Sequence, residues 1–329
     1  MKHIARVLLV VLAAPLLVML VGPFLVPVRP LPGLRPPAAL AGPQSQFISL
    51  PFDGTDGIDV HYRAGGQGEP VFVLLHGFAS SLYTWDEVFD DFAVRGRALA
   101  YDRPPFGLSE RLIEGDWSAS NPYSPDAAVT QITTFLDLQS VERAVLVGNS
   151  AGGTLALRAA LAHPERVAGL ILISPAVYSG GGAPGFIRPL LATPQMQRLG
   201  PLVSRSFRAL GDSLETQAYH DPGIITNEQR ERARLGLQVE NWDRALWEFT
   251  RASQESDLPA RLGEIRVPVL VITGDDDRIV PAEQSIRLAG ELPDAELVVL
   301  PNCGHVAQEE CEDEMLAAVE AWLADRGLD

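Results

Sequence analysis

The sequence predicts an α/β fold in which a mostly parallel central sheet is covered by helices on both faces and carries a helical lid. Short continuous runs of Val, Ile and Leu alternate with helical patterns from Phe47 onward, as a parallel sheet buried on both faces requires. One long stretch without strand signals interrupts this alternation. The chain of 329 residues is long enough for one large α/β domain with an insertion.

The chain begins with an apolar segment that predicts a membrane anchor. An uncharged run extends from Val7 to Val28, and about 22 residues can cross a hydrocarbon core at about 1.5 Å each. Three prolines weaken a straight helix there but are tolerated in membrane spans. We therefore expect residues 1–28 to be a retained anchor that contacts the membrane through residues 7–28, with the main domain outside the cytoplasm.

Two other interpretations of this segment stay open. Lys2 and Arg6 would supply the basic start of a cleaved signal peptide, which would make the protein secreted, although the A-x-A pattern at residues 39–41 lies far downstream. A buried helix of a soluble protein is the third interpretation. Residues 29–46 contain five prolines and predict a Pro-rich linker, a stiff spacer between this segment and the folded part.

An antiparallel hairpin opens the folded part, and buried strands follow. FISL (47–50) and IDVHYR (58–63) flank the turn region DGTDG. Further strands are expected over residues 71–75, 97–102, 144–148, 167–174, 267–273 and 296–300. Helices are expected over residues 125–138, 151–162, 282–289 and 309–324. Residues 47–175 and 257–329 are thus predicted to form the two parts of one core.

The stretch between the two core parts predicts a helical lid over residues 176–256. It starts with the flexible YSGGGAPG and continues with Arg-, Glu- and Gln-rich helical segments. Apolar residues, among them Phe207, Trp242 and Trp247, are numerous enough to pack it against the core.

The overall charge counts against a nucleic-acid partner. The chain has 42 acidic and 26 basic residues, a net charge of −16, which repels phosphate backbones. It contains neither a phosphate-binding or dinucleotide-binding glycine loop nor a histidine cluster with metal-ligand spacing. We therefore expect no cofactor and no metal, and a small molecule as the ligand.

Ser150 is the first candidate for chemistry. It lies in Gly148-Asn149-Ser150-Ala151-Gly152-Gly153, a G-x-S-x-G pattern between a predicted strand and a predicted helix. Glycines on both sides permit a tight, strained turn, and the helix N-terminus favours developing negative charge. The pattern alone is weak, but its position between strand and helix strengthens it.

A nucleophilic serine needs a base, and the base needs an acid. His305 follows the last predicted strand, at the edge where ligand sites of parallel sheets gather, and is the candidate base. The acid precedes the histidine in the chain order expected for this arrangement. GDDDRIVP follows the strand at 267–273, so the candidates are Asp275, Asp276 and Asp277.

These motifs together resemble the α/β-hydrolase superfamily over nearly everything from Phe47 to the C-terminus. The matching pieces are HGF (76–78) with Trp85, YDRPPFGLSE (101–110), GNSAGG (148–153), GDDDRIVP (274–281) and CGHVAQEE (303–310). The resemblance implies that Asp277 is the acid, which completes a Ser150, Asp277, His305 triad. It also implies that the backbone N–H groups of Phe78 and Ala151 form an oxyanion hole, and that His76 shapes the turn beside it.

The resemblance further implies a serine hydrolase. We expect an esterase or lipase that acts on a carboxylic ester. A C–C bond hydrolase of the meta-cleavage-product type is the alternative, because GNSAGG, GDDDRIVP and CGHVAQ resemble that subgroup, although GFASSL and Val306 depart from it. A non-catalytic binding module of the same fold is a second alternative.

The two cysteines, Cys303 and Cys311, flank His305. A disulfide that braces this loop is one interpretation. We expect two buried free thiols instead, because the spacing alone does not establish the geometry that a bridge needs.

Overall fold

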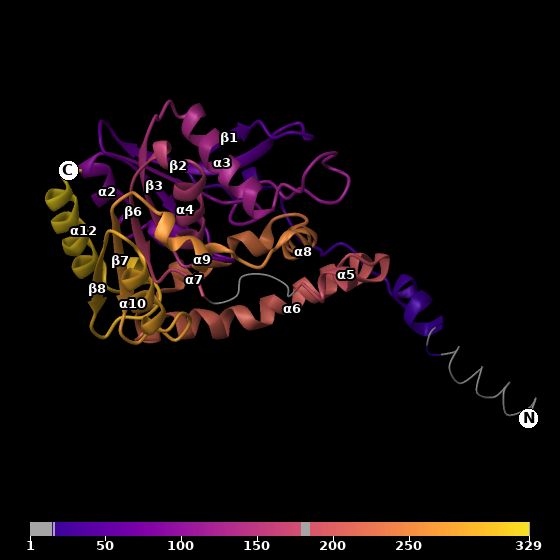
Figure 1. The fold of residues 1–329 in the computed structure, drawn as a ribbon. Helices are drawn as coiled ribbons and strands as arrows, with labels where there is room; N and C mark the ends of the chain where they lie inside the picture. Colours follow the sequence, from indigo (N-terminus) through magenta and orange to yellow (C-terminus); the bar gives the residue numbers. More distant parts are fainter. Residues whose placement is uncertain (1–14, 16, 179–184, 329) are drawn as a thin grey trace, which may run out of the picture.

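Eight strands form a single sheet in a computed structural model that describes residues 15, 17–178 and 185–328. The strand order is β1-β2-β4-β3-β5-β6-β7-β8 (Figure 1). The strands are β1 (Gln46–Leu50), β2 (Ile58–Gly66), β3 (Val71–Leu75), β4 (Arg97–Tyr101), β5 (Ala144–Asn149), β6 (Val167–Ile173), β7 (Val269–Gly274) and β8 (Ala295–Leu300).

The sheet is mostly parallel, as predicted. β2 pairs antiparallel with β1 and β4, whereas every pair from β4 through β3, β5, β6 and β7 to β8 is parallel. All residues of Val71–Leu75 and of Val269–Gly274 are buried, which explains their continuous apolar runs. The carboxyl ends of these strands lie at one edge of the sheet, where the candidate site residues follow them.

Helices cover both faces of the sheet. The α-helices are α2 (Phe89–Arg95), α3 (Pro125–Leu138), α4 (Ala151–Ala162), α5 (Arg188–Leu191), α6 (Pro194–Ala218), α7 (Asn227–Ala233), α8 (Trp242–Ala252), α9 (Leu258–Arg261), α10 (Ala282–Glu291), α11 (Ala307–Glu310) and α12 (Glu312–Arg326). Short 3-10 helices are η1 (Pro37–Ala39), η2 (Leu82–Trp85), η3 (Pro164–Arg166), η4 (Pro222–Ile224), η5 (Leu235–Gln238) and η6 (Leu262–Glu264).

The two faces have separate cores. Val73 of β3 packs in one cluster with Phe135 of α3 and Leu157 of α4. Its neighbour Phe72 points to the other face and packs with helices α2 and α12. Successive residues of a strand face opposite sides, so both sides of one strand are apolar here. Figure 1 shows α4 and α12 on opposite sides of the sheet.

Local sequence signals fix the helices that carry the site. Ser124 caps α3 by accepting a hydrogen bond from the Ala127 N–H at 3.2 Å, and Pro125 occupies the first helical position. Both α3 and α4 begin and end where the sequence predicted. The helix predicted over 309–324 is divided instead into α11 and α12, with a break at Cys311.

The described residues between β6 and β7 form helices and no strand. We call this segment the helical insertion; it contains α5 to α9, and the long α6 crosses below the sheet in Figure 1. Gly200 of α6 lies under the indole ring of Trp247 in α8, since a Cβ at Gly200 would come within 2.0 Å of that ring. Close contact between α6 and α8 therefore depends on this glycine.

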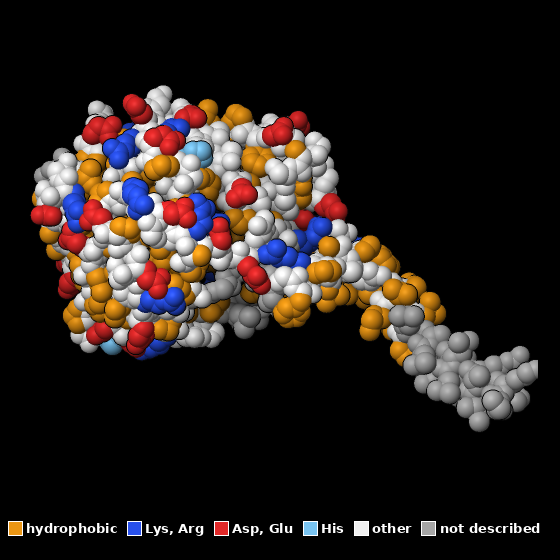
Figure 2. Space-filling view, in the orientation of Figure 1, with side chains coloured by type: hydrophobic (Ala, Val, Ile, Leu, Met, Phe, Trp, Pro, Cys, Tyr) orange, Lys and Arg blue, Asp and Glu red, His pale blue; other side chains and the backbone are white. Residues whose placement is uncertain are grey.

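The described part of the N-terminal segment contradicts the predicted membrane anchor. Residues 17–25 are helical and project from the body with exposed apolar side chains (Figures 1 and 2). The described helical residues are about half of what a span needs. Within the described residues, no helix is sufficiently long and apolar to cross a membrane. The membrane contact through residues 7–28 and the extracytoplasmic or secreted placement expected from this segment are corrected accordingly; residues 7–14 and 16 lie outside the described residues.

The Pro-rich stretch 29–46 lies against the folded part. The Arg35 N–H donates to the Gln238 carbonyl at 2.9 Å, and the Glu240 N–H donates back to the Arg35 carbonyl at 3.0 Å. Leu31 and Leu34 pack beside Trp242 of the helical insertion. Backbone hydrogen bonds and apolar contacts thus fix this stretch onto the insertion instead of leaving it as a spacer.

Candidate active site

Ser150 occupies a strained turn between β5 and α4. Its φ is 55° and its ψ is −120°, a conformation outside the favoured regions for a residue with a side chain. Such a conformation costs about 1–3 kcal/mol and persists where the surroundings enforce it. The Ser150 N–H donates to the Ile173 carbonyl of β6 at 2.9 Å, which ties the turn to the neighbouring strand.

Two glycines make this turn possible. A Cβ at Gly152 would lie 1.9 Å from the Leu75 carbonyl oxygen of β3. A Cβ at Gly148 would lie 2.5 Å from the Gly152 backbone. No side chain fits at either position, so the G-x-S-x-G pattern is explained by sterics, as the sequence predicted.

His305 and Asp277 form a buried pair. His305 Nδ1 lies 2.8 Å from Asp277 Oδ2, and the residues are each 6% exposed. The other carboxylate oxygen, Oδ1, accepts hydrogen bonds from the backbone N–H groups of Ile279 at 2.9 Å and Val280 at 2.8 Å. A carboxylate oxygen accepts, so Nδ1 of His305 donates to it and Nε2 is left to accept a proton.

Two of the three predicted triad residues line one cavity. Ser150 and His305 line a cavity of about 680 Å³, and Asp277 is hydrogen-bonded to His305 Nδ1. Apolar side chains dominate the other cavity walls, among them Phe78, Phe207 and Val306. Helices of the insertion supply many of these residues, so the insertion forms part of the cavity wall.

The other two aspartates of GDDDRIVP have different environments. Asp276 Oδ2 lies 2.8 Å from His220 Nδ1 in the helical insertion and also pairs with Arg278. Asp275 is exposed. Among the described contacts, Asp277 alone of the three bonds to His305.

The turn after β3 faces Ser150. His76 Nδ1 donates to the Gly77 carbonyl at 2.8 Å, and the Arg103 guanidinium donates to the same oxygen at 3.1 Å. Because C=O and N–H of a trans peptide point in opposite directions, these bonds turn the Phe78 N–H away from His76. A Cβ at Gly77 would lie 3.3 Å from the Ser150 Cβ, which shows how closely this turn approaches the serine.

His76 is held neutral. Burial is the main cause that lowers the pKa of His76 to about 3, and the nearby charge of Arg103 lowers it further. Its Nε2 accepts a hydrogen bond from the Arg103 N–H at 2.9 Å. With both ring nitrogens engaged in backbone bonds, His76 shapes the turn, which agrees with the role that the resemblance implied.

Asn149 is a site residue whose role the sequence analysis missed. Its side-chain Nδ2 donates to the His305 carbonyl at 3.0 Å and to the Ile173 carbonyl at 3.2 Å. The residue before the serine therefore fixes the backbone of the histidine loop. The motif contained this asparagine, but no local signal connects it with a loop 156 residues away.

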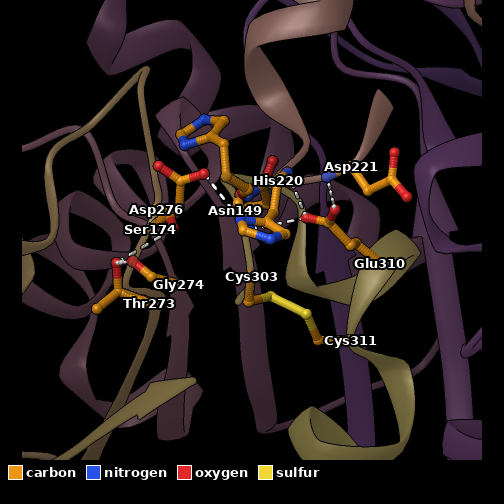
Figure 3. Close-up of a disulfide and its surroundings, with 12 residues drawn as sticks. Asn149, Ser174, His220, Asp221, Thr273, Gly274, Asp276, Cys303, Glu310 and Cys311 are labelled. Atoms are coloured by element: carbon orange, nitrogen blue, oxygen red, sulfur yellow. Dashed lines mark hydrogen bonds and ion pairs between the residues drawn. A yellow bond between two sulfur atoms is a disulfide. The ribbon is translucent and has the colours of Figure 1, made fainter. Parts of the chain in front are cut away.

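A disulfide and Glu310 brace the same loop (Figure 3). Cys303 and Cys311 are bonded, with 6.2 Å between their Cα atoms, so the expectation of two free thiols is wrong. The short helix α11 turns the chain back and brings Cys311 within the distance that a bridge requires.

The Glu310 carboxylate accepts from the N–H groups of Gly304 at 2.7 Å, His220 at 2.9 Å and Asp221 at 2.8 Å.

Glu309 places a titratable group in the cavity. It lines the cavity and accepts hydrogen bonds from the Thr84 hydroxyl and, at 2.7 Å, from the Tyr219 hydroxyl. Burial raises the pKa of Glu309 to about 7, and these hydrogen bonds only partly oppose the shift. Around neutral pH this side chain therefore changes between an acid and a carboxylate.

Glu309→Gln is expected to change how stability depends on pH. The folded pKa of about 7 lies above the unfolded value of 4.5, so the folded state binds more protons between these values. The stability that Glu309 contributes to the wild type is therefore lost as pH rises from about 4.5 to 7. Glutamine does not titrate, so the variant has no such loss. Relative to wild type, the free energy of unfolding of the variant should rise by about 3 kcal/mol between pH 4.5 and pH 8.

Urea unfolding at the two pH values measures this difference. Glu314→Gln, on the exposed side of α12, is the matched control and should show the same difference from wild type at both values. An equal effect of Glu309→Gln at pH 4.5 and pH 8 would refute the raised pKa.

Comparisons with known proteins agree with the predicted fold. Residues 70–311 match the family described as the alpha/beta hydrolase fold. A 2-hydroxy-6-oxononadienedioate/2-hydroxy-6-oxononatrienedioate hydrolase of Paraburkholderia phymatum is 33% identical over 276 residues, which cover 81% of this chain and 91% of that protein. The chain is thus similar to a curated hydrolase over most of both lengths.

Solved structures give the same result. The 2-hydroxy-6-oxo-6-phenylhexa-2,4-dienoate hydrolase of Rhodococcus sp. strain RHA1 matches with a TM-score of 0.62 and 27% identity, over 84% of this chain and 98% of that one. A thermophilic esterase of Thermogutta terrifontis matches with a TM-score of 0.67 and 20% identity, over 85% and 99%. At that identity the esterase supports the fold alone.

The names of the relatives support hydrolase activity in general, and they favour the C–C alternative over the ester prediction. The chain belongs to the alpha/beta hydrolase fold family, whose model matches residues 70–311.

Proposed function

We propose that the protein is a serine hydrolase that cleaves a bond to a carbonyl carbon by nucleophilic attack of Ser150. The observation that carries this proposal is the buried His305–Asp277 pair beside the strained Ser150. His305 and Ser150 line the same cavity, and the Nε2 atom of His305 faces away from Asp277. A non-catalytic protein would have no need to hold this geometry, which costs backbone strain.

The proposed reaction proceeds through an acyl-enzyme. His305 Nε2 takes the Ser150 proton, and the serine oxygen attacks the carbonyl carbon. His305 then gives the proton to the leaving group, whose bond to the carbonyl carbon breaks. A water molecule, deprotonated by His305, releases the acyl group and restores Ser150.

The oxyanion would bind to two backbone N–H groups. Ala151 is the first residue of α4, so its N–H is free of bonding within the helix. The Phe78 N–H belongs to the peptide whose carbonyl is held by His76 and Arg103. Each such donor contributes about 3 kcal/mol to stabilisation of the transition state.

The preferred substrate of the proposal is a conjugated 2-hydroxy-6-oxo-dienoate, in which a C–C bond is cleaved. This is the substrate class in the names of relatives 30–33% identical over about four fifths of the chain. Arg208 and Arg234 of the helical insertion line the Ser150 cavity and would suit the carboxylate of such a substrate. Glu215 lies 3.9 Å from Arg234, so Arg208 is the better candidate.

A carboxylic ester is the second candidate. It is favoured by the apolar cavity wall around Phe78, Phe207 and Val306, which suits an acyl chain. The two candidates differ in their leaving groups. An ester releases an alcohol, whereas C–C cleavage releases a carbon leaving group that is stabilised by conjugation.

A direct comparison of substrates tests the proposal. We expect kcat/KM for 2-hydroxy-6-oxo-6-phenylhexa-2,4-dienoate to exceed that for every member of a p-nitrophenyl ester series by about 100-fold or more. The loss of dienoate absorbance and the release of p-nitrophenol are the two readouts. The reverse ratio would favour the ester candidate, and turnover of neither class would contradict both.

A further inference from the structure

A second serine, histidine and aspartate are aligned away from Ser150. Ser45 Oγ lies 2.8 Å from His61 Nε2, and His61 Nδ1 lies 2.6 Å from Asp102 Oδ2. This is the atomic order of a serine, base and acid triad, with Nδ1 facing the carboxylate and Nε2 facing the hydroxyl. We propose that Ser45 is a second nucleophile, activated by His61 and Asp102, which accepts acyl groups from activated esters such as aryl esters.

The environment of Asp102 sets the tautomer of His61. Asp102 is fully buried and accepts hydrogen bonds from the N–H groups of Leu82 and Leu108, both at 2.6 Å. Burial alone would raise the pKa of Asp102, but the hydrogen bonds from His61 and from the Leu108 N–H oppose burial, and the pKa is lowered. The carboxylate is therefore ionised, His61 Nδ1 donates to it, and Nε2 accepts from the Ser45 hydroxyl.

Ser45 opens onto its own cavity. A cavity of about 560 Å³ is lined by Ser45, His61 and Tyr83, with Arg63 and Arg232 at its charged side. Among the described residues, none lines both this cavity and the one at Ser150. A buried histidine–aspartate pair with only a structural role would not need a serine hydroxyl on Nε2 at the wall of a cavity.

The turn that carries Ser45 is ordered by its own hydrogen bonds. The Ser45 N–H donates to the Gly42 carbonyl at 3.1 Å, and the Gly42 N–H donates to Ser45 Oγ at 3.1 Å. The Tyr83 hydroxyl also interacts with Ser45. Ser45 Oγ thus lies beside the imidazole and accepts from the Gly42 N–H, a donor that would favour negative charge on the oxygen as its proton leaves.

The proposed chemistry balances without a further reactant. The Ser45 O–H bond breaks and its proton moves to His61 Nε2, while the oxygen forms a bond to the acyl carbon. The bond from that carbon to the phenolic oxygen breaks, and the phenol leaves with the proton from His61. The product is an ester on Ser45. A fluorophosphonate follows the same route, with fluoride as the leaving group and phosphorus as the atom attacked.

Fluorophosphonate labelling of the full chain tests the proposal, with Ser150→Ala to remove the first nucleophile. We expect peptide mass spectrometry to find label on Ser45 in that variant. Adding Ser45→Ala should abolish this label, and adding His61→Gln should slow labelling by about 100-fold, the contribution of a general base. Adding Ser49→Ala, on the same strand region but outside the cavity, should leave the label in place.

The folded state is checked by thermal unfolding, because His61 is buried. If the His61→Gln variant melts early, Ser45→Ala and Ser49→Ala still decide the question, since Ser45 is only partly buried and Ser49 is exposed. Label that is absent from the Ser150→Ala variant, or that survives Ser45→Ala, would overturn the proposal. Neither outcome depends on the substrate of Ser150.

Discussion

Ser150→Ala is expected to lower kcat/KM for the best substrate by about 10⁵-fold. The serine oxygen is the atom that bonds to the carbonyl carbon, and no other hydroxyl is expected to replace it in the same cavity geometry. Substrate should still bind, because the apolar walls and the arginines of the cavity are unchanged. A substrate complex of the variant with a Kd close to the wild-type value would show that chemistry, and not binding, was lost.

Ser174→Ala is a matched control for this loss. Ser174 also follows a central strand, β6, is buried, and has a positive φ of 46°, but it does not line the cavity. Its removal should change kcat/KM by less than about fivefold. If Ser150→Ala retained more than about 1% of wild-type turnover, the assignment of the nucleophile would be wrong.

Much of the fold could be predicted because local signals and tertiary structure agree. Val71–Leu75 is a continuous apolar run and is a fully buried strand. Pro125 and the Ser124 cap mark the start of α3, and Gly148 and Gly152 leave room for the turn at Ser150. In each case, the residue type is dictated by a constraint within a few positions in the sequence.

The features that the sequence did not reveal depend on contacts between distant segments. Asn149 bonds to the His305 loop across 156 residues, and Ser45 bonds to a histidine that in turn bonds to Asp102. The disulfide depends on how α11 turns the chain, which the spacing of the cysteines does not determine. None of these pairs has a periodicity or motif that marks it.

The N-terminal segment shows the same limit. Its apolar run predicted a membrane anchor, yet the described part is a short helix whose Leu20 carbonyl accepts a hydrogen bond from Gln195 of α6 at 3.1 Å. Further along, Arg205 of α6 donates to the Arg29 carbonyl at 2.7 Å. Hydropathy gives the composition of a segment, but it does not give the element that lies beside it.

Asp277→Asn is expected to lower kcat by about 10⁴-fold while leaving the fold intact. In the wild type, Oδ1 of Asp277 accepts from two backbone N–H groups and Oδ2 faces His305 Nδ1. The asparagine oxygen would keep the place of Oδ1, since only an acceptor fits there, and its NH₂ would face Nδ1. His305 would then carry its proton on Nε2 and could not take one from Ser150. Nitrogen-15 shifts of the His305 ring would report this change of tautomer directly.

The neighbouring aspartates make this prediction specific, because all three substitutions remove one carboxylate from the same turn. Asp275 is exposed, and Asp276 contacts His220 and Arg278 at a partly exposed site, so Asp275→Asn and Asp276→Asn should each stay within about fivefold of wild-type kcat. A general loss of negative charge would affect the three variants alike, whereas loss of the His305 partner affects only Asp277→Asn. Equal losses in the three variants, or a normal His305 tautomer in Asp277→Asn, would therefore refute the assignment of Asp277 as the acid that orients His305.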